Sequence, residues 1–90
     1  MHANTLYNYG VMLDTHCNRK EEAEHLYRRC LSVDPNHAYA LYNLAVLLEE
    51  TGKDLVEVLS LYTRAVQADP QDATTLADYG RCALSIRVCL

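Results

Sequence analysis

The sequence predicts an all-α protein built as a short solenoid of about five antiparallel helices. Three observations support this fold class. The chain repeats itself at an offset of 35 residues, apolar residues recur at the three-four spacing of amphipathic helices, and two segments close on an Asp-Pro pair. A period of about 20–50 residues is typical of solenoids, in which each unit packs only on its neighbours.

The repeat is visible when the chain is aligned with itself. Residues 1–35 and 36–70 are identical at 13 of 35 positions, where unrelated segments would share about two. The identical pairs are His2/His37, Ala3/Ala38, Leu6/Leu41, Tyr7/Tyr42, Asn8/Asn43, Val11/Val46, Leu13/Leu48, Glu22/Glu57, Leu26/Leu61, Tyr27/Tyr62, Arg29/Arg64, Asp34/Asp69 and Pro35/Pro70. The chain is therefore expected to form a single domain, with repeat 1 at about 1–35, repeat 2 at about 36–70, and a partial third repeat or capping helix at about 71–90.

The repeated positions carry a resemblance to a known family. Large and small apolar residues alternate along each copy, and a proline closes it. In the second copy these residues are Leu41, Ala45, Leu48, Tyr62, Ala65 and Pro70, and in the first they are Leu6, Gly10, Leu13, Ala23, Tyr27, Cys30 and Pro35. The pattern resembles the tetratricopeptide repeat, a helix–turn–helix unit of about 34 residues, and the resemblance implies a right-handed superhelix. Each copy has one extra residue, in the turn at 15–20 or 51–55, where an insertion costs least.

The first repeat is expected to contain helices at about 3–16 and 19–33. Ala3, Leu6, Gly10, Leu13 and Cys17 share one face of the first helix. Glycine inside a helix costs about 0.5–1 kcal/mol relative to alanine, so Gly10 predicts a closely packed neighbouring helix, and Ala45 and Gly80 occupy matching positions.

In the second helix of repeat 1, the predicted core residues are Ala23, Leu26, Tyr27, Cys30 and Leu31. Asn18 and Glu21 have the spacing of a capping box at its start. Asp34-Pro35 ends it, because the residue before proline is disfavoured in the helical region.

The second repeat is expected to contain helices at about 37–50 and 55–68. The predicted core residues are Ala38, Leu41, Ala45, Leu48, Val58, Leu61, Tyr62 and Ala65. Gly52 predicts a left-handed residue at the end of the third helix. Asp54 and Glu57 predict a capping box at the start of the fourth helix, and Asp69-Pro70 predicts the end of that helix. A fifth helix begins near Asp72, with no sixth helix to pair with it in the 90 residues.

Composition narrows the function classes. The net charge is −4 without a basic run, which argues against a nucleic-acid partner. No apolar run reaches the roughly 18 residues that suggest a membrane span, and no secretory signal is recognisable. The four cysteines lack the setting of a secreted disulfide framework, so we expect a reduced, intracellular and cytoplasmic protein.

Catalytic and metal-binding motifs are missing from the sequence. It contains no glycine-rich phosphate loop, no nucleophile elbow, no H-E-x-x-H and no C-x-x-C. His16, Cys17 and His25 are interpreted as polar residues of an exposed turn and helix, and His2 and His37 as surface residues near helix starts. The chain is predicted to be non-enzymatic, without cofactor or metal.

In family members that clamp a C-terminal carboxylate, asparagines at the positions of Asn8 and Asn43 contact the peptide end, and nearby basic residues neutralise it. The asparagines match, but Thr74 and Asp78 stand where positive charge would be required. An aspartate repels a carboxylate, so this mode of binding is disfavoured.

The resemblance implies that the first helix of each repeat lines a concave groove. The helix period places aromatic, amide and acidic residues on that face. The candidate groove residues are Asn4, Tyr7, Asn8, Val11, Asp14 and Thr15 from repeat 1, Tyr39, Tyr42, Asn43, Val46, Glu49 and Glu50 from repeat 2, and Thr74, Asp78 and Arg81 from the third. We hypothesise that the groove binds a neutral-to-basic peptide with an apolar anchor. The competing interpretation is that Tyr7 and Tyr42 pack within the superhelix and that the acids are solvated.

A second hypothesis concerns the C-terminal helix, which is apolar for a solubilising end cap. Under this hypothesis the chain is a self-assembling repeat unit that oligomerises through this helix, or it is part of a longer array. The candidate self-association residues are Leu84, Ile86, Val88 and Leu90.

Overall fold

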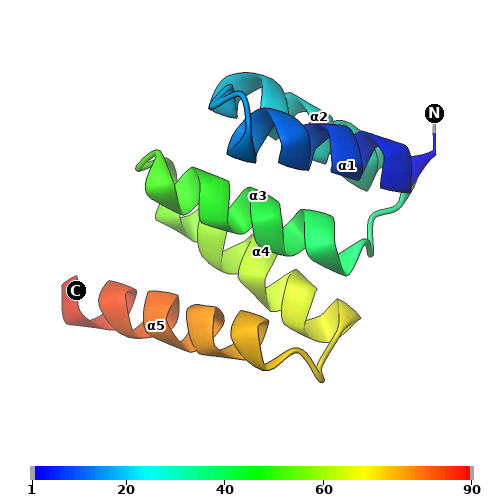
Figure 1. The fold of residues 1–90 in the computed structure, drawn as a ribbon. Coiled ribbons are helices and arrows are strands. Elements are labelled where there is room, and N and C mark those ends of the chain that lie inside the picture. The colour runs from blue at the N-terminus through cyan, green and yellow to red at the C-terminus, as the bar shows by residue number, and fades with distance from the viewer. Residues whose placement is uncertain (1, 90) are drawn as a thin grey trace.

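The computed structural model contains five α-helices, which are α1 (Ala3–Thr15), α2 (Lys20–Val33), α3 (Ala38–Glu50), α4 (Leu55–Ala68) and α5 (Ala73–Cys89). The structure describes the backbone of residues 2–89 and the side chains of residues 2–84, and no strand occurs in that part of the chain. The α1–α2 pair, the α3–α4 pair and α5 stack one after another (Figure 1). The predicted all-α solenoid is confirmed.

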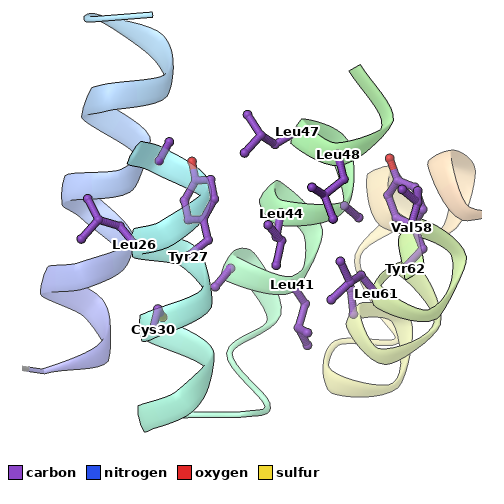
Figure 2. Packing of buried hydrophobic residues seen from close by; sticks show 14 of the residues in the cluster. Leu26, Tyr27, Cys30, Leu41, Leu44, Leu47, Leu48, Val58, Leu61 and Tyr62 are labelled. Atoms are coloured by element: carbon purple, nitrogen blue, oxygen red, sulfur yellow. The ribbon is translucent and has the colours of Figure 1, made fainter. Parts of the chain in front are cut away.

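Each helix pair buries the apolar seam that the repeat predicted. Tyr27 and Tyr62 are wholly buried, and Figure 2 shows each on the second helix of its repeat. Cys30 and Ala65 are buried at equivalent positions as small residues. The predicted seam residues that are buried are Leu6, Gly10, Leu13, Ala23, Leu26, Tyr27, Cys30, Leu41, Ala45, Leu48, Val58, Leu61, Tyr62 and Ala65, while Ala3, Leu31 and Ala38 are partly buried.

A second buried side of the first helices was not predicted. Ala40, Leu44 and Leu47 of α3 are at most 1% exposed. They belong to the side on which α3 packs against α2, and Figure 2 shows Leu44 facing that neighbouring helix. Thr75 and Cys82 are the buried counterparts in α5, which packs on α4. Stacking of repeats therefore buries a face that an isolated helix pair would leave exposed.

The predicted helix ends are mostly confirmed. α2 and α4 end before Asp34 and Asp69, and Gly52 has a φ of +71°. The capping box is confirmed in part, because the Asp54 carboxylate accepts a hydrogen bond from the Val56 amide at 2.9 Å, whereas the Glu57 carboxylate binds Arg28 of α2. Asp72 likewise accepts from the Thr74 amide at 3.1 Å, at the start of α5.

Two predictions at the turn between α1 and α2 are wrong. Asn18 does not cap α2. It has a φ of +51°, a left-handed conformation that asparagine tolerates, and Arg19 occupies the N-cap position without a side-chain hydrogen bond. The Arg19 amide instead donates to the Leu13 carbonyl at 2.8 Å, which closes the end of α1. Because α1 ends at Thr15, Cys17 lies beyond the helix and is exposed rather than in the core.

The glycine prediction holds at one of its two positions. A Cβ at Gly10 would lie 2.8 Å from Cε1 of Tyr27, so the absence of a side chain allows α2 to approach α1 closely. At Gly80 a Cβ would meet nothing within 4 Å. The expectation of close packing at Gly80 is wrong, because no described helix covers this side of α5.

Candidate functional site

α1, α3 and α5 occupy the same place in successive repeats, and side-chain hydrogen bonds join them on the predicted groove face. His37 joins α1 to α3. Its Nδ1 accepts from the Ala40 amide at 3.1 Å, which leaves Nε2 as the protonated nitrogen that donates to Oδ1 of Asn4 at 2.8 Å. His37 is only 9% exposed, so its interpretation as a surface residue is wrong, whereas His2 is exposed.

Tyrosines and an asparagine make a second link between α1 and α3. Nδ2 of Asn43 donates to the Tyr7 hydroxyl at 3.3 Å. The Tyr7 ring is stacked on Tyr39 of α3 at a centroid distance of 6.0 Å and tilted against His37, the N-cap of α3, at 5.1 Å. Burial raises the pKa of the Tyr7 hydroxyl. The hydroxyl is therefore neutral at physiological pH.

Charged residues link α3 to α5. Arg81 donates to both carboxylate oxygens of Glu49, at 2.7 and 2.9 Å, and this guanidinium lowers the pKa of Glu49. The Tyr42 hydroxyl donates to Asp78 at 2.6 Å, a bond to a carboxylate that raises the pKa of Tyr42 to about 12. Two of the predicted groove acids are thus already hydrogen-bonded within the solenoid.

Other predicted groove residues remain available at the surface. Tyr39 is 60% exposed. Asn4, Asn8, Thr15, Glu50, Thr74 and Arg81 are exposed, while Tyr7, Val11, Asp14, Tyr42, Asn43, Val46, Glu49 and Asp78 are partly buried. Tyr7 and Tyr42 pack against the core, as the competing interpretation supposed.

This face keeps a net negative charge after the internal ion pairs are counted. Its four carboxylates are those of Asp14, Glu49, Glu50 and Asp78. Two cations balance them in part, because Lys20 lies 2.7 Å from Asp14 and 3.5 Å from Glu50, and Arg81 binds Glu49. Four negative against two positive charges leave a net excess of negative charge on this face.

The face contains no recognisable catalytic arrangement. Among the residues that the structure describes, no three His, Cys, Asp or Glu side chains are grouped to hold a metal ion. Cys17, Cys30 and Cys82 are free thiols, and burial raises the pKa of Cys30 and Cys82, which keeps them protonated and unreactive. None of the described helices is sufficiently long and apolar to cross a membrane.

Paired antiparallel helices that stack at a fixed sequence period define this protein as an α-helical repeat solenoid. Two family models match it, one over residues 3–37 and the other over residues 26–55, and both describe the tetratricopeptide repeat. The chain belongs to the tetratricopeptide repeat family, whose members bind other proteins and are typically non-enzymatic. A search of curated proteins gave no match.

Proposed function

We propose that the chain is a non-enzymatic interaction module that binds a neutral-to-basic peptide segment along the α1–α3–α5 face. The observation that carries the proposal is the set of hydrogen bonds that join the three helices, Asn4–His37, Tyr7–Asn43, Tyr42–Asp78 and Glu49–Arg81. A ligand that lies across this face meets a pre-formed surface, which lowers the entropic cost of binding.

Three exposed residues are the proposed contacts. Tyr39 offers an aromatic surface for an apolar anchor, and its ring is already supported by Tyr7. Asn8 has no side-chain hydrogen bond among the described residues, so both its donor and its acceptor can bind a peptide backbone. Glu50 supplies exposed negative charge. Tyr42 and Glu49 instead stabilise the face, because their polar groups are engaged within the chain.

The proposal is tested by selecting short peptides from a displayed library against the whole chain. The selected peptides should be enriched in Lys or Arg around one large apolar residue. Tyr39→Ala should weaken the binding of these peptides about tenfold, which corresponds to about 1.4 kcal/mol. Glu50→Lys should reduce the salt dependence of their binding. Tyr9→Ala is the matched control, since Tyr9 is also an exposed tyrosine but lies outside this face. Peptides that tolerate Tyr39→Ala but lose binding with Tyr9→Ala would contradict the proposal.

The alternative proposal, self-assembly through the C-terminal helix, has its own support. Leu76 and Leu84 of α5 are 43% and 62% exposed, and Gly80 lies open between them. Ile86, Val88 and Leu90 lie outside the residues whose side chains are described. Light scattering over a concentration series tests this alternative. An oligomer that Leu84→Glu converts to a monomer would support assembly, and a concentration-independent monomer would contradict it.

A further inference from the structure

The α1–α2 pair has an end face, which is the side that points away from α3 in the described stack, and the equivalent surface of the second repeat is buried. Tyr9 and Met12 of α1 are 47% and 46% exposed, whereas their counterparts 35 residues later, Leu44 and Leu47, are each 1% exposed. The difference arises because α2 packs on α3, while no described helix packs on this side of α1. An aromatic and a thioether side chain are therefore left at the surface.

A pocket lies on this end face, and its residues stand in register with an occupied interface in the same chain. Tyr9, Glu22, Leu26 and Arg29 line the pocket. Thirty-five residues further on, Leu44, Glu57, Leu61 and Arg64 face Arg28, Leu31 and Ser32 of α2. Three of these four positions are identical in the two repeats. The interior of the chain thus shows what kind of element covers such a surface.

The occupied interface specifies the chemistry of that element. Arg28 of α2 donates to both oxygens of Glu57 at 3.1 Å, and Leu31 follows one helical turn later. Glu22 occupies the position of Glu57. Within the described part of the chain, its ion pair is with Arg19 at 3.7 Å, a long and solvent-exposed contact that is weak. An arginine arriving from another helix can form the shorter bidentate pair with Glu22.

We infer that the end face formed by Tyr9, Met12, Glu22 and Leu26 is a docking site for an amphipathic helix of a partner protein. That helix carries an arginine opposite Glu22 and a leucine, three residues later, against Tyr9 and Leu26. It lies on α1 and α2 as α2 lies on α3 and α4. This surface is separate from the proposed peptide-binding face.

A second copy of the chain fits this face less well. The second helices of a copy are already covered on the matching side, α2 by α3 and α4 by α5. In addition, α4 has Thr63 and Val66 at the positions of Arg28 and Leu31, so it has no cation to place opposite Glu22. α5 carries Arg81 and Leu84 at the required spacing, but Arg81 is already paired with both oxygens of Glu49 at 2.7 and 2.9 Å. Coverage of the second helices and the engaged state of Arg81 therefore favour a helix with a different sequence.

The probe is a peptide of residues 20–36 in which a hydrocarbon bridge replaces the side chains of Leu26 and Cys30. The bridge removes the cost of helix nucleation. It lies on the side that faces α1 in the native chain, so the peptide cannot readily replace α2 in the core. Titration into the isotopically labelled full chain should shift the amide signals of Tyr9, Met12 and Leu26.

A charge exchange tests the arginine contact. Glu22→Arg in the protein should weaken peptide binding about tenfold, and the peptide with Arg28→Glu should regain that loss on the same variant. A double variant of exposed α4 residues, Ser60→Arg with Gln67→Arg, makes the same change in net charge and should leave binding unchanged. The inference would be overturned by the absence of shifts at millimolar peptide, by binding that does not depend on Glu22, or by shifts centred on Leu44 and Leu47. If the mass of the free chain increased with concentration and Tyr9→Lys abolished this increase, the occupant would be a second copy of the chain. That result would also overturn the inference.

Discussion

Tyr27 and Tyr62 occupy the same position in the two repeats, and both are wholly buried, but their hydroxyl groups are treated differently. The Tyr62 hydroxyl donates to Glu49 at 3.0 Å. The Tyr27 hydroxyl has no hydrogen-bond partner in the described part of the chain, and burial raises its pKa. The residue at the position of Glu49 in repeat 1 is Asp14, which is one methylene shorter and binds Lys20 at 2.7 Å. The two acids therefore differ by one methylene group, and the repeat with the shorter acid lacks the buried hydrogen bond.

The same comparison extends to the packing of the repeats. Position by position, the seam between the helices of each pair is alike, while the outer side of the first helix is buried in repeat 2 and exposed in repeat 1. The position of a repeat in the stack, and not its own sequence alone, therefore decides how much of it is covered.

The largest expected difference between the repeats is in the free energy of unfolding when a side chain on the outer side of the first helix is truncated to alanine. Leu44→Ala should lower the free energy of unfolding by about 2–5 kcal/mol, because it leaves a cavity between α2 and α3. Tyr9→Ala at the equivalent exposed position should cost less than about 1 kcal/mol. Urea unfolding of the two variants measures both values. Equal losses would show that the end face is covered in the free protein.

Replacing Gly10 and Gly80 separately by alanine should change the free energy of unfolding in opposite directions. At Gly10 the new Cβ would lie 2.8 Å from the Tyr27 ring, so Gly10→Ala should destabilise the chain by roughly 1 kcal/mol after the gain in helix propensity is subtracted. At Gly80 the space is open, and Gly80→Ala should stabilise α5 by about 0.5–1 kcal/mol. Thermal unfolding measures both. Destabilisation by Gly80→Ala would mean that another element approaches α5 closely in solution.

The sequence was sufficient to predict the features that depend on each repeat alone. The seam residues and the Asp-Pro ends follow from helical periodicity and backbone preferences, and both copies report the same pattern. The burial of Leu44 was not predictable in this way, because its counterpart Tyr9 differs in chemistry and in neighbours. His37 was missed for a related reason. Its partner Asn4 lies in another repeat, and sequence identity at an offset says nothing about which side chains reach across.

The family resemblance assigned the candidate groove to the first helix of each repeat, and that assignment stays a prediction. The hydrogen-bonded state of its residues was not predictable from the sequence. Asp78 and Arg81 come from the partial third repeat, where the identity is weakest, and they bind Tyr42 and Glu49. Whether an acidic residue is solvated or paired depends on the length and position of its neighbour, which no single-repeat pattern contains. Binding by this face remains a proposal.

Removal of the two buried hydroxyl groups bears most directly on the comparison between the repeats. Tyr62→Phe should destabilise the chain by about 1–2 kcal/mol, since it removes a hydrogen bond to a carboxylate. Tyr27→Phe should be neutral or stabilise the chain by up to about 1 kcal/mol, because it deletes an unpaired buried polar group. Asp14→Glu provides the third arm. Its longer side chain should reach Tyr27 as Glu49 reaches Tyr62, and the resulting stabilisation of about 1 kcal/mol should vanish when Tyr27→Phe is also present. A gain that persists in the double variant would assign the effect to Lys20 instead.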